Sequence, residues 1–124
     1  LATVNPGDEV IVPDVTFPST ANAVRKTGAE PVLADIDRTT WTIDVTRLNE
    51  LVTDRTKAII VVHLYGQPCD MDAIMQLATK YGLYVVEDTA QALFSKYQGD
   101  YMGTKSDAGC FSMAISKLVF ACCT

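Results

Sequence analysis

The chain has a single histidine, a single tryptophan and few basic side chains among its 124 residues. One histidine excludes a multi-histidine metal site within this sequence. Ten lysines and arginines stand against 15 aspartates and glutamates, so the formal charge is −5. Because no run of basic residues forms a stripe, we expect neither nucleic acids nor anionic membranes as partners. No apolar stretch approaches the roughly 20 residues that a membrane-spanning helix needs.

Phosphate-binding loop motifs are also missing. No Gly-x-Gly-x-x-Gly or Walker-type sequence follows any apolar run, which argues against a generic doubly wound nucleotide-binding domain. The spacing of the four cysteines fits neither a zinc site nor a regular disulfide framework. No signal peptide is visible. A missing N-terminus would hide one, so the cysteine spacing alone leads us to expect reduced, mostly buried thiols in a cytoplasmic protein.

Both ends of the chain look internal. It begins with Leu1 rather than Met and ends in Cys122-Cys123-Thr124 directly after an apolar segment, so we expect a fragment of a longer protein. Hydrophobic residues make up 48% of the sequence, which is enough for a folded core. Since no internal repeat, low-complexity segment or linker is visible, the chain reads as one domain or a piece of one.

Short apolar runs alternate with amphipathic segments along most of the chain. The apolar, β-branched runs predict strands at 9–13, 31–35, 57–62 and 83–86. Helical spacing and end signals predict helices at 18–26, from Asp44 to Val52, and from Asp70 to Gly82. This alternation is typical of an α/β fold, a mostly parallel sheet with helices on both faces. Residues 94–102 then predict a hairpin with Gly99-Asp100 at its middle, and 107–112 predict a last strand.

Reactive side chains gather where the predicted strands end. Ligands of open parallel sheets bind outside the carboxyl ends of the strands. This rule brings together residues 14–17, 63–66, 88–91 and 112–117, which hold most of the reactive side chains of the sequence. We therefore expect the functional site at this edge.

Two charged residues at this edge fit a protonated heterocycle that also reacts with an amine. Asp88 ends an apolar strand, where an ionised carboxylate is costly unless a cation meets it. It could hold a pyridinium nitrogen protonated and so strengthen an electron sink; the alternative is that Glu87 or Asp88 caps a following helix. Lys117 has apolar neighbours such as Ile115 and Leu118, which would lower its pKa for Schiff-base formation. The alternative is a surface lysine at the start of a helix.

Four further residues at this edge could contact such a ring. Ser112, at a strand end beside a turn, could bind a phosphate. Phe17 could lie flat on the ring or be an ordinary core aromatic. Gln91, expected one turn into a helix after the fourth strand, could reach a ring oxygen or face solvent. His63 ends the third strand at the same edge, or is a satisfied core histidine.

Together these residues stand in a recognisable order: an aromatic residue, His-x-Tyr-Gly, Glu-Asp-x-x-Gln and Phe-Ser-x4-Lys. In this order the sequence resembles the DegT/DnrJ/EryC1/StrS family of sugar aminotransferases, which use pyridoxal phosphate (PLP). The resemblance covers nearly the whole chain. It rests on the segments GDEVIVP (7–13), TF (16–17), TANA (20–23), GAEPV (28–32), DID (35–37), KAII (57–60), HLYGQP (63–68), DMD (70–72) and EDTAQA (87–92).

The resemblance implies a fold and a set of contacts with the cofactor. The chain would be part of the fold-type-I large domain over 1–124, without an N-terminal segment and the C-terminal small domain, in a protein that forms a homodimer. Lys117 would form the Schiff base with the cofactor aldehyde and later move a proton. The other implied contacts are Asp88 with the pyridine nitrogen, Gln91 with the 3-hydroxyl, Ser112 with the phosphate, Phe17 with the ring face, and His63 in a less defined place.

The reaction that the resemblance implies is transfer of an amino group from an amino-acid donor, usually glutamate, to a keto-sugar attached to a nucleotide. Dehydratase relatives replace the lysine by histidine, so Lys117 favours transamination. Two alternatives stay open. One is a non-catalytic or incomplete fragment of such an enzyme, and the other is a PLP-dependent sugar dehydratase or aromatizing relative.

Overall fold

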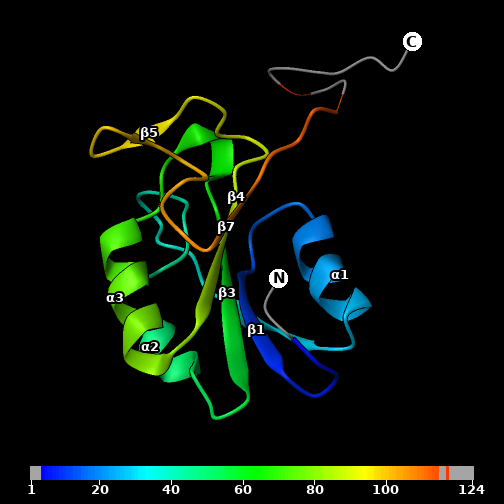
Figure 1. Cartoon of the computed structure of the whole chain (residues 1–124). Helices are drawn as coiled ribbons and strands as arrows, with labels where there is room; N and C mark the ends of the chain where they lie inside the picture. Colours follow the sequence, from blue (N-terminus) through cyan, green and yellow to red (C-terminus); the bar gives the residue numbers. More distant parts are fainter. Residues whose placement is uncertain (1–3, 115–116, 118–124) are drawn as a thin grey trace.

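Five strands form one fully parallel sheet in the order β2-β1-β3-β4-β7 (Figure 1). The computed structural model describes residues 4–114 and Lys117, so the predictions that concern Ile115, Leu118 and the cysteine pair 122–123 lie outside the described residues. The strands are β1 (Glu9–Pro13), β2 (Glu30–Ala34), β3 (Thr56–Val62), β4 (Tyr84–Asp88) and β7 (Ala108–Cys110). The predicted α/β fold with a mostly parallel sheet is confirmed.

Helices lie on both sides of this sheet (Figure 1). The helix α1 (Ser19–Lys26) packs on one face, where its Val24 joins Val10 and Val12 of β1. On the other face α2 (Leu48–Leu51) and α3 (Met71–Tyr81) cover the larger core, which includes Ile59 of β3 and Val85 of β4. Successive strand residues point to opposite faces, so β1 and β3 supply side chains to both cores, whereas β2 and β4 supply only the larger one.

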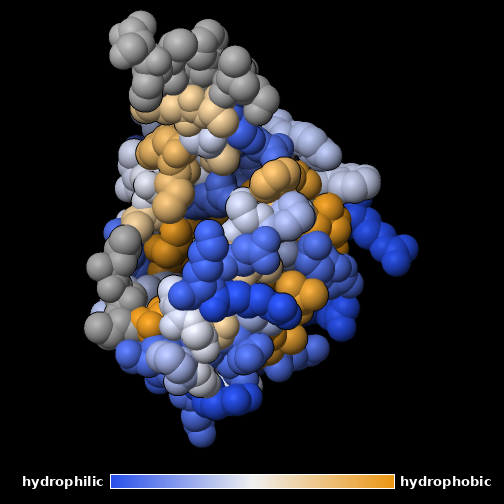
Figure 2. Space-filling view, turned by 90° about the vertical axis from the view of Figure 1, so that its right-hand side faces the viewer, coloured by the Kyte–Doolittle hydropathy of each residue, from blue (hydrophilic) through white to orange (hydrophobic). Residues whose placement is uncertain are grey.

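The α1 side of the sheet is only partly covered by the described residues. Beyond α1 this side carries an apolar groove of about 560 Å³ over β4 and β7. Figure 2, which views this side, shows hydrophobic surface beside the hydrophilic outer side of α1. The groove is lined by Val4, Val10, Ala23, Val24, Thr27, Ala58, Ile60, Tyr84, Val86, Asp107, Ala108 and Cys110.

The strand that carries the two carboxylates is longer than its apolar run predicts. We expected it to end at Val86, but β4 continues through Glu87 and Asp88, which pair with Val61 and Val62 of β3. It continues because both carboxylates find hydrogen-bond donors, described below, and a buried carboxylate with donors no longer opposes the strand.

Two predicted helix starts are wrong. Asp44 caps no helix, because its Oδ1 accepts from the backbone N–H and the hydroxyl of Thr46 at 2.9 and 2.6 Å, which forms a local turn. The helix α2 begins only at Leu48 and is one turn long. No helix follows Asp88 either, since residues 89–95 form turns. Asp70, in contrast, caps α3 by accepting from the N–H of Ala73 at 3.1 Å, and α3 ends before Gly82 in a left-handed conformation.

The predicted hairpin is present as β5 (Lys96–Tyr97) and β6 (Asp100–Tyr101), which pair antiparallel. Its turn is one residue earlier than expected: Gln98 and Gly99 occupy it with φ of 52° and 95°. Two positive φ values in succession match the tight turn that suits the twist of a hairpin. A one-turn 3-10 helix, η1 (Leu64–Gly66), follows β3 at the same end of the sheet.

Candidate functional site

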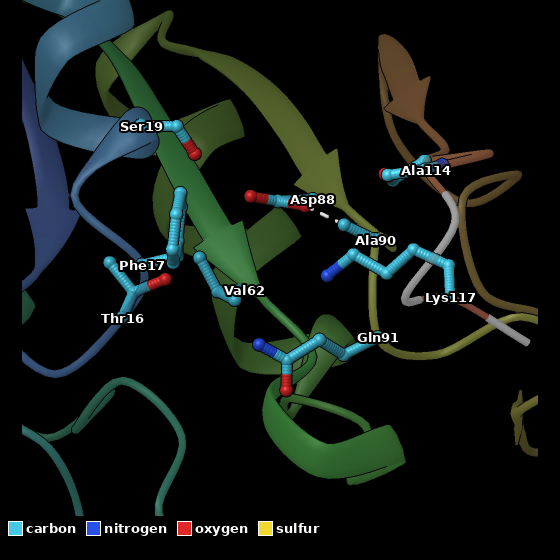
Figure 3. Close-up of a pocket in the computed structure, with 10 residues that line it drawn as sticks. Thr16, Phe17, Ser19, Val62, Asp88, Ala90, Gln91, Ala114 and Lys117 are labelled. Carbon is cyan, nitrogen blue, oxygen red and sulfur yellow. Dashed lines mark hydrogen bonds between the residues drawn. The ribbon is translucent and has the colours of Figure 1, made fainter.

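A cavity of about 310 Å³ lies at the carboxyl ends of the strands, beside the start of α1 (Figure 3). This volume is at the lower end of the range for small-molecule sites, roughly 300–1,000 Å³. Five of the six residues that the sequence selects line it: Phe17, Asp88, Gln91, Ser112 and Lys117. The edge predicted from strand topology is therefore where these side chains meet.

Asp88 is the last residue of β4 and directs its carboxylate into the cavity on the α1 side (Figure 3). Its Oδ1 accepts from the backbone N–H of Ala90 at 3.1 Å, and its Oδ2 accepts from the hydroxyl of Thr20 at 3.2 Å. Thr20 belongs to the first turn of α1 and is buried. These two bonds fix the carboxylate from both sides and leave it half-buried with further lone pairs for a ligand.

Phe17 stands in the loop between β1 and α1 with its ring in the cavity, across from Lys117 (Figure 3). The side chain is 69% exposed, so it lies outside the core that the described residues form. An exposed aromatic ring next to a carboxylate offers a flat apolar surface for a planar ligand.

Gln91 lies in the turns after β4, and its side chain is fixed at one end. The carbonyl oxygen of its amide accepts from the backbone N–H of Tyr65 in η1 at 3.1 Å. Figure 3 shows the amide nitrogen on the side of Phe17 and Val62, so the group offers a donor to the cavity. Tyr65 itself has a φ of 53°, a conformation that is uncommon for a large side chain.

Ser112 and Lys117 reach the cavity from the segment that follows β7. The hydroxyl of Ser112 accepts from the N–H of Ala114 at 3.4 Å, and the N–H of Lys117 donates to the carbonyl of Ala114 at 2.8 Å. The Lys117 side chain runs back toward the strands, so that its amine points into the cavity near Asp88 and Gln91 (Figure 3). An amine from the segment after β7 and a carboxylate from the end of β4 thus face the same cavity.

His63 is the one predicted site residue that does not line the cavity. Its side chain is fully buried on the α3 side of the sheet. Its Nδ1 accepts from the N–H of Cys69 at 3.1 Å, so the ring proton is on Nε2, which donates to Glu87 Oε2 at 3.1 Å. With both ring nitrogens occupied, His63 fits the alternative of a satisfied core histidine.

Glu87 is the residue that the sequence reasoning missed. It is fully buried, on the face opposite to Asp88, and accepts four hydrogen bonds. The donors are the His63 Nε2, the N–H of Gly103 at 2.7 Å, the N–H of Lys105 at 2.9 Å and the Ser106 hydroxyl at 2.8 Å. One signal was available, because adjacent residues of a strand point to opposite faces and only one of two neighbouring carboxylates can face the cavity.

The electrostatics of the buried side are set by these contacts. Burial acts to raise the pKa of Glu87, but the hydrogen bonds from His63, Gly103, Ser106 and Lys105 outweigh it and lower the pKa to about 2. Burial raises the pKa of the Cys69 thiol to about 12. The carboxylate is therefore ionised at neutral pH, and the thiol is protonated and inert.

Two other kinds of site find no support in residues 4–114 and Lys117. These residues contain no group of three or more histidines, cysteines and carboxylates arranged to hold a metal ion. Within the same part of the chain, no helix is both long and apolar enough to cross a membrane.

Comparison with known proteins gives consistent matches. The sequence model of the DegT/DnrJ/EryC1/StrS aminotransferase family matches residues 1–123. GDP-perosamine synthase of Escherichia coli O157:H7 is 46% identical over 116 residues, which are 94% of this chain and 32% of that protein. The chain thus spans about a third of the length of such relatives.

Solved structures agree with this match. The aminotransferase from Psychrobacter cryohalolentis superposes with a TM-score of 0.92 at 43% identity, covering 94% of this chain and 30% of that one. Spr1654 from Streptococcus pneumoniae, described as a sugar aminotransferase in its PLP form, superposes with a TM-score of 0.87 at 33% identity, covering 94% of this chain and 34% of that one.

Proposed function

Because the chain belongs to the DegT/DnrJ/EryC1/StrS aminotransferase family, we propose that its cavity is the PLP site of an enzyme that moves an amino group to a nucleotide-linked keto-sugar. The observation that carries this proposal is the meeting of Asp88 and Lys117 at one cavity beside the exposed ring of Phe17. The nucleotide-sugar substrate is supported by the relative named GDP-perosamine synthase, and glutamate is the donor that we propose.

The residues of the cavity fit PLP in their chemistry. Asp88 would hold the ring nitrogen, since its carboxylate is fixed by Thr20 and Ala90 and still opens to the cavity. The exposed Phe17 ring would cover one face of the cofactor, and the amide of Gln91 would meet its 3-hydroxyl. Ser112 would bind the phosphate. Bound PLP supplies an electron sink that stabilises negative charge at the carbon bearing the amine.

The chain's own residues divide the work of proton transfer. The amine of Lys117 would attach the cofactor, be released by the donor amine, and then take and return a proton at its Nζ. Asp88 would keep the proton on the ring nitrogen, because an ionised carboxylate stabilises the cation beside it. His63, buried against Glu87 on the opposite face of the sheet from Asp88, would stabilise this end of the strands without touching the ligand.

Two exposed aromatic side chains, one in η1 and one in the turns after β4, support a homodimer. Tyr65 is 81% and Phe94 is 71% exposed, and both have positive φ values of 53° and 69°. Strained backbone clusters at functional sites, and exposed apolar side chains grouped together mark interaction surfaces. We propose that a second copy of the protein packs against Tyr65 and Phe94 in a symmetric dimer.

We also propose that the protein is cytoplasmic. Cys69 and Cys110 are both free thiols in the structure. Free thiols fit a reducing compartment, where disulfides are rare.

The experiment that tests the function is a transamination assay of the full-length protein with PLP, glutamate and a nucleotide-linked keto-sugar, followed by mass analysis of the product. An aminated sugar is expected, whereas a dehydrated or aromatized product would contradict the proposal. Asp88→Asn should retain PLP and lower kcat by about a hundredfold or more. Near-normal turnover of Asp88→Asn would refute the role of Asp88.

A further inference from the structure

The four hydrogen bonds of Glu87 all run in one direction, from donor to carboxylate. The contacts of Gly103 and Lys105 are backbone N–H groups, which can only donate. His63 also donates, because its Nδ1 already accepts from Cys69. Glu87 Oε2 therefore faces two groups that can only donate, the His63 Nε2–H and the Gly103 N–H. Oε1 faces one such group, the Lys105 N–H, together with the Ser106 hydroxyl.

This arrangement accepts a carboxylate and rejects its neutral amide. A glutamine would have to place its NH2 group against either His63 and Gly103 or against Lys105. Each choice leaves at least one part-buried backbone donor facing another donor, and an unmade hydrogen bond away from water costs more than the average made one is worth. Burial and donor pattern together show that the pocket around Glu87 is built for an ionised group.

The donors belong to segments that converge on the cavity. Residues 103–106 lead directly into β7, which continues into Ser112 and Lys117. The carbonyl of Ala108 in β7 also accepts from the Ser106 hydroxyl at 3.2 Å. Gly103 packs so closely on Gly109 that a Cβ atom at Gly109 would collide with the Gly103 backbone. Glu87 thus holds the segment that aligns β7 with β4.

The histidine extends the same network to another wall of the cavity. His63 precedes η1, whose Tyr65 N–H holds the Gln91 side chain. The carbonyl of Gly66 in η1 accepts from the Ser95 hydroxyl at 2.9 Å, which ties this loop to the turns after β4. The segments that carry Asp88, Gln91 and Lys117 are therefore linked on the buried side of β4.

We propose that Glu87 is a positioning residue for the cofactor site, whose buried carboxylate joins the segments before η1 and before β7 and so sets the place of Gln91 and Lys117 relative to Asp88. This role rests on the proposed function, because PLP is the ligand whose binding Glu87 would affect. Glu87 acts through other residues, since it lies on the face opposite to Asp88 and touches no part of the cavity. Replacing Glu87 by glutamine should therefore alter PLP binding without removing any group that contacts PLP.

The chain offers a matched control at the opposite end of the sheet. Glu9 in β1 is also buried, and it accepts from the Thr53 hydroxyl at 2.6 Å and pairs with Arg55. The change Glu9→Gln disturbs a buried carboxylate of the same sheet near the amino ends of the strands. It should lower stability without reaching the cavity.

The test compares Glu87→Gln, Glu9→Gln and the unchanged full-length protein in PLP titrations followed by visible absorption, with hydrogen exchange of the Gly103 and Lys105 amides before PLP is added. For Glu87→Gln we expect PLP binding about tenfold weaker, an altered absorption spectrum of the bound cofactor, and at least about tenfold faster exchange. For Glu9→Gln we expect unchanged PLP binding and unchanged exchange at these amides. Should Glu87→Gln fail to fold, Ser106→Ala removes a single donor and should weaken PLP binding about threefold.

The outcomes separate this inference from the proposed function. Unchanged PLP binding and spectrum in a folded Glu87→Gln, or in Ser106→Ala, would overturn the positioning role while the proposed function stands. Equal weakening by Glu9→Gln would overturn it too, because the effect would then be general destabilisation. If the unchanged protein binds no PLP, the proposed function fails, and the positioning role fails with it.

Discussion

The ionised state of Glu87 makes the stability of this fold depend on pH in a way that one substitution removes. Its pKa is lowered from the usual 4.5 to about 2 by four hydrogen bonds that outweigh burial. A group whose pKa is depressed on folding adds stability above its unfolded pKa and loses it as the pH falls through the folded value. The window for Glu87 therefore runs from 4.5 down to about 2.

The size of the effect follows from this interval. Each pKa unit corresponds to about 1.4 kcal/mol, so the depressed pKa contributes about 3 kcal/mol to the free energy of unfolding at neutral pH. Protonated glutamic acid resembles glutamine in placing a donor against the N–H of either Gly103 or Lys105. The unchanged protein should thus exceed Glu87→Gln by about 3 kcal/mol near pH 7, and by about half of that near pH 3.

The assay is urea unfolding of both proteins at several pH values, with the difference between them as the quantity of interest. Asp37 and Asp100 also have lowered pKa values, through hydrogen bonds from Thr40 and Lys105 respectively, but both are present in each protein and cancel. A difference that stays constant from neutral to acid pH would refute the reasoning, because Glu87 would then have no depressed pKa to lose.

Two further results are expected. Thr20→Val removes the hydroxyl that donates to Asp88 at 3.2 Å and keeps the shape of the side chain, so it should lower stability by about 1 kcal/mol and weaken PLP binding a few-fold in a titration. The control Thr56→Val, at the other end of the sheet, should leave PLP binding unchanged. Equal weakening of PLP binding by the two substitutions would contradict the role of Thr20. Cys110 is exposed whereas the pKa of Cys69 is raised to about 12 by burial, so iodoacetamide near neutral pH should modify Cys110 and spare Cys69 in peptide mapping; modification of Cys69 in the folded protein would contradict its burial.

The sheet could be predicted because its signal is local. Apolar, β-branched runs between amphipathic segments place each strand of the main sheet within a few residues, and parallel topology then sends their carboxyl ends to one edge. This is sufficient to predict that Phe17, Asp88 and Lys117 lie at one edge, and all three line one cavity there.

Local patterns fail where two local structures compete or where a partner is distant. Asp44 can cap a helix or close a turn with Thr46, and the sequence does not say which. The network of Glu87 joins residues 16 to 24 positions apart, and two of its four donors are backbone groups that no side-chain pattern reveals. The burial of His63 follows from that network, so its place away from the cavity could not be read from its position after β3.

The central claim, that Lys117 attaches PLP in this cavity, is tested most directly by trapping the attachment. The full-length protein is incubated with PLP, reduced with borohydride and mapped by mass spectrometry, beside Lys117→Ala and Lys96→Ala as the exposed-lysine control. The reduced cofactor should be found on Lys117, be lost in Lys117→Ala and remain in Lys96→Ala. A specific adduct on another lysine, or one that persists in Lys117→Ala, would contradict the claim.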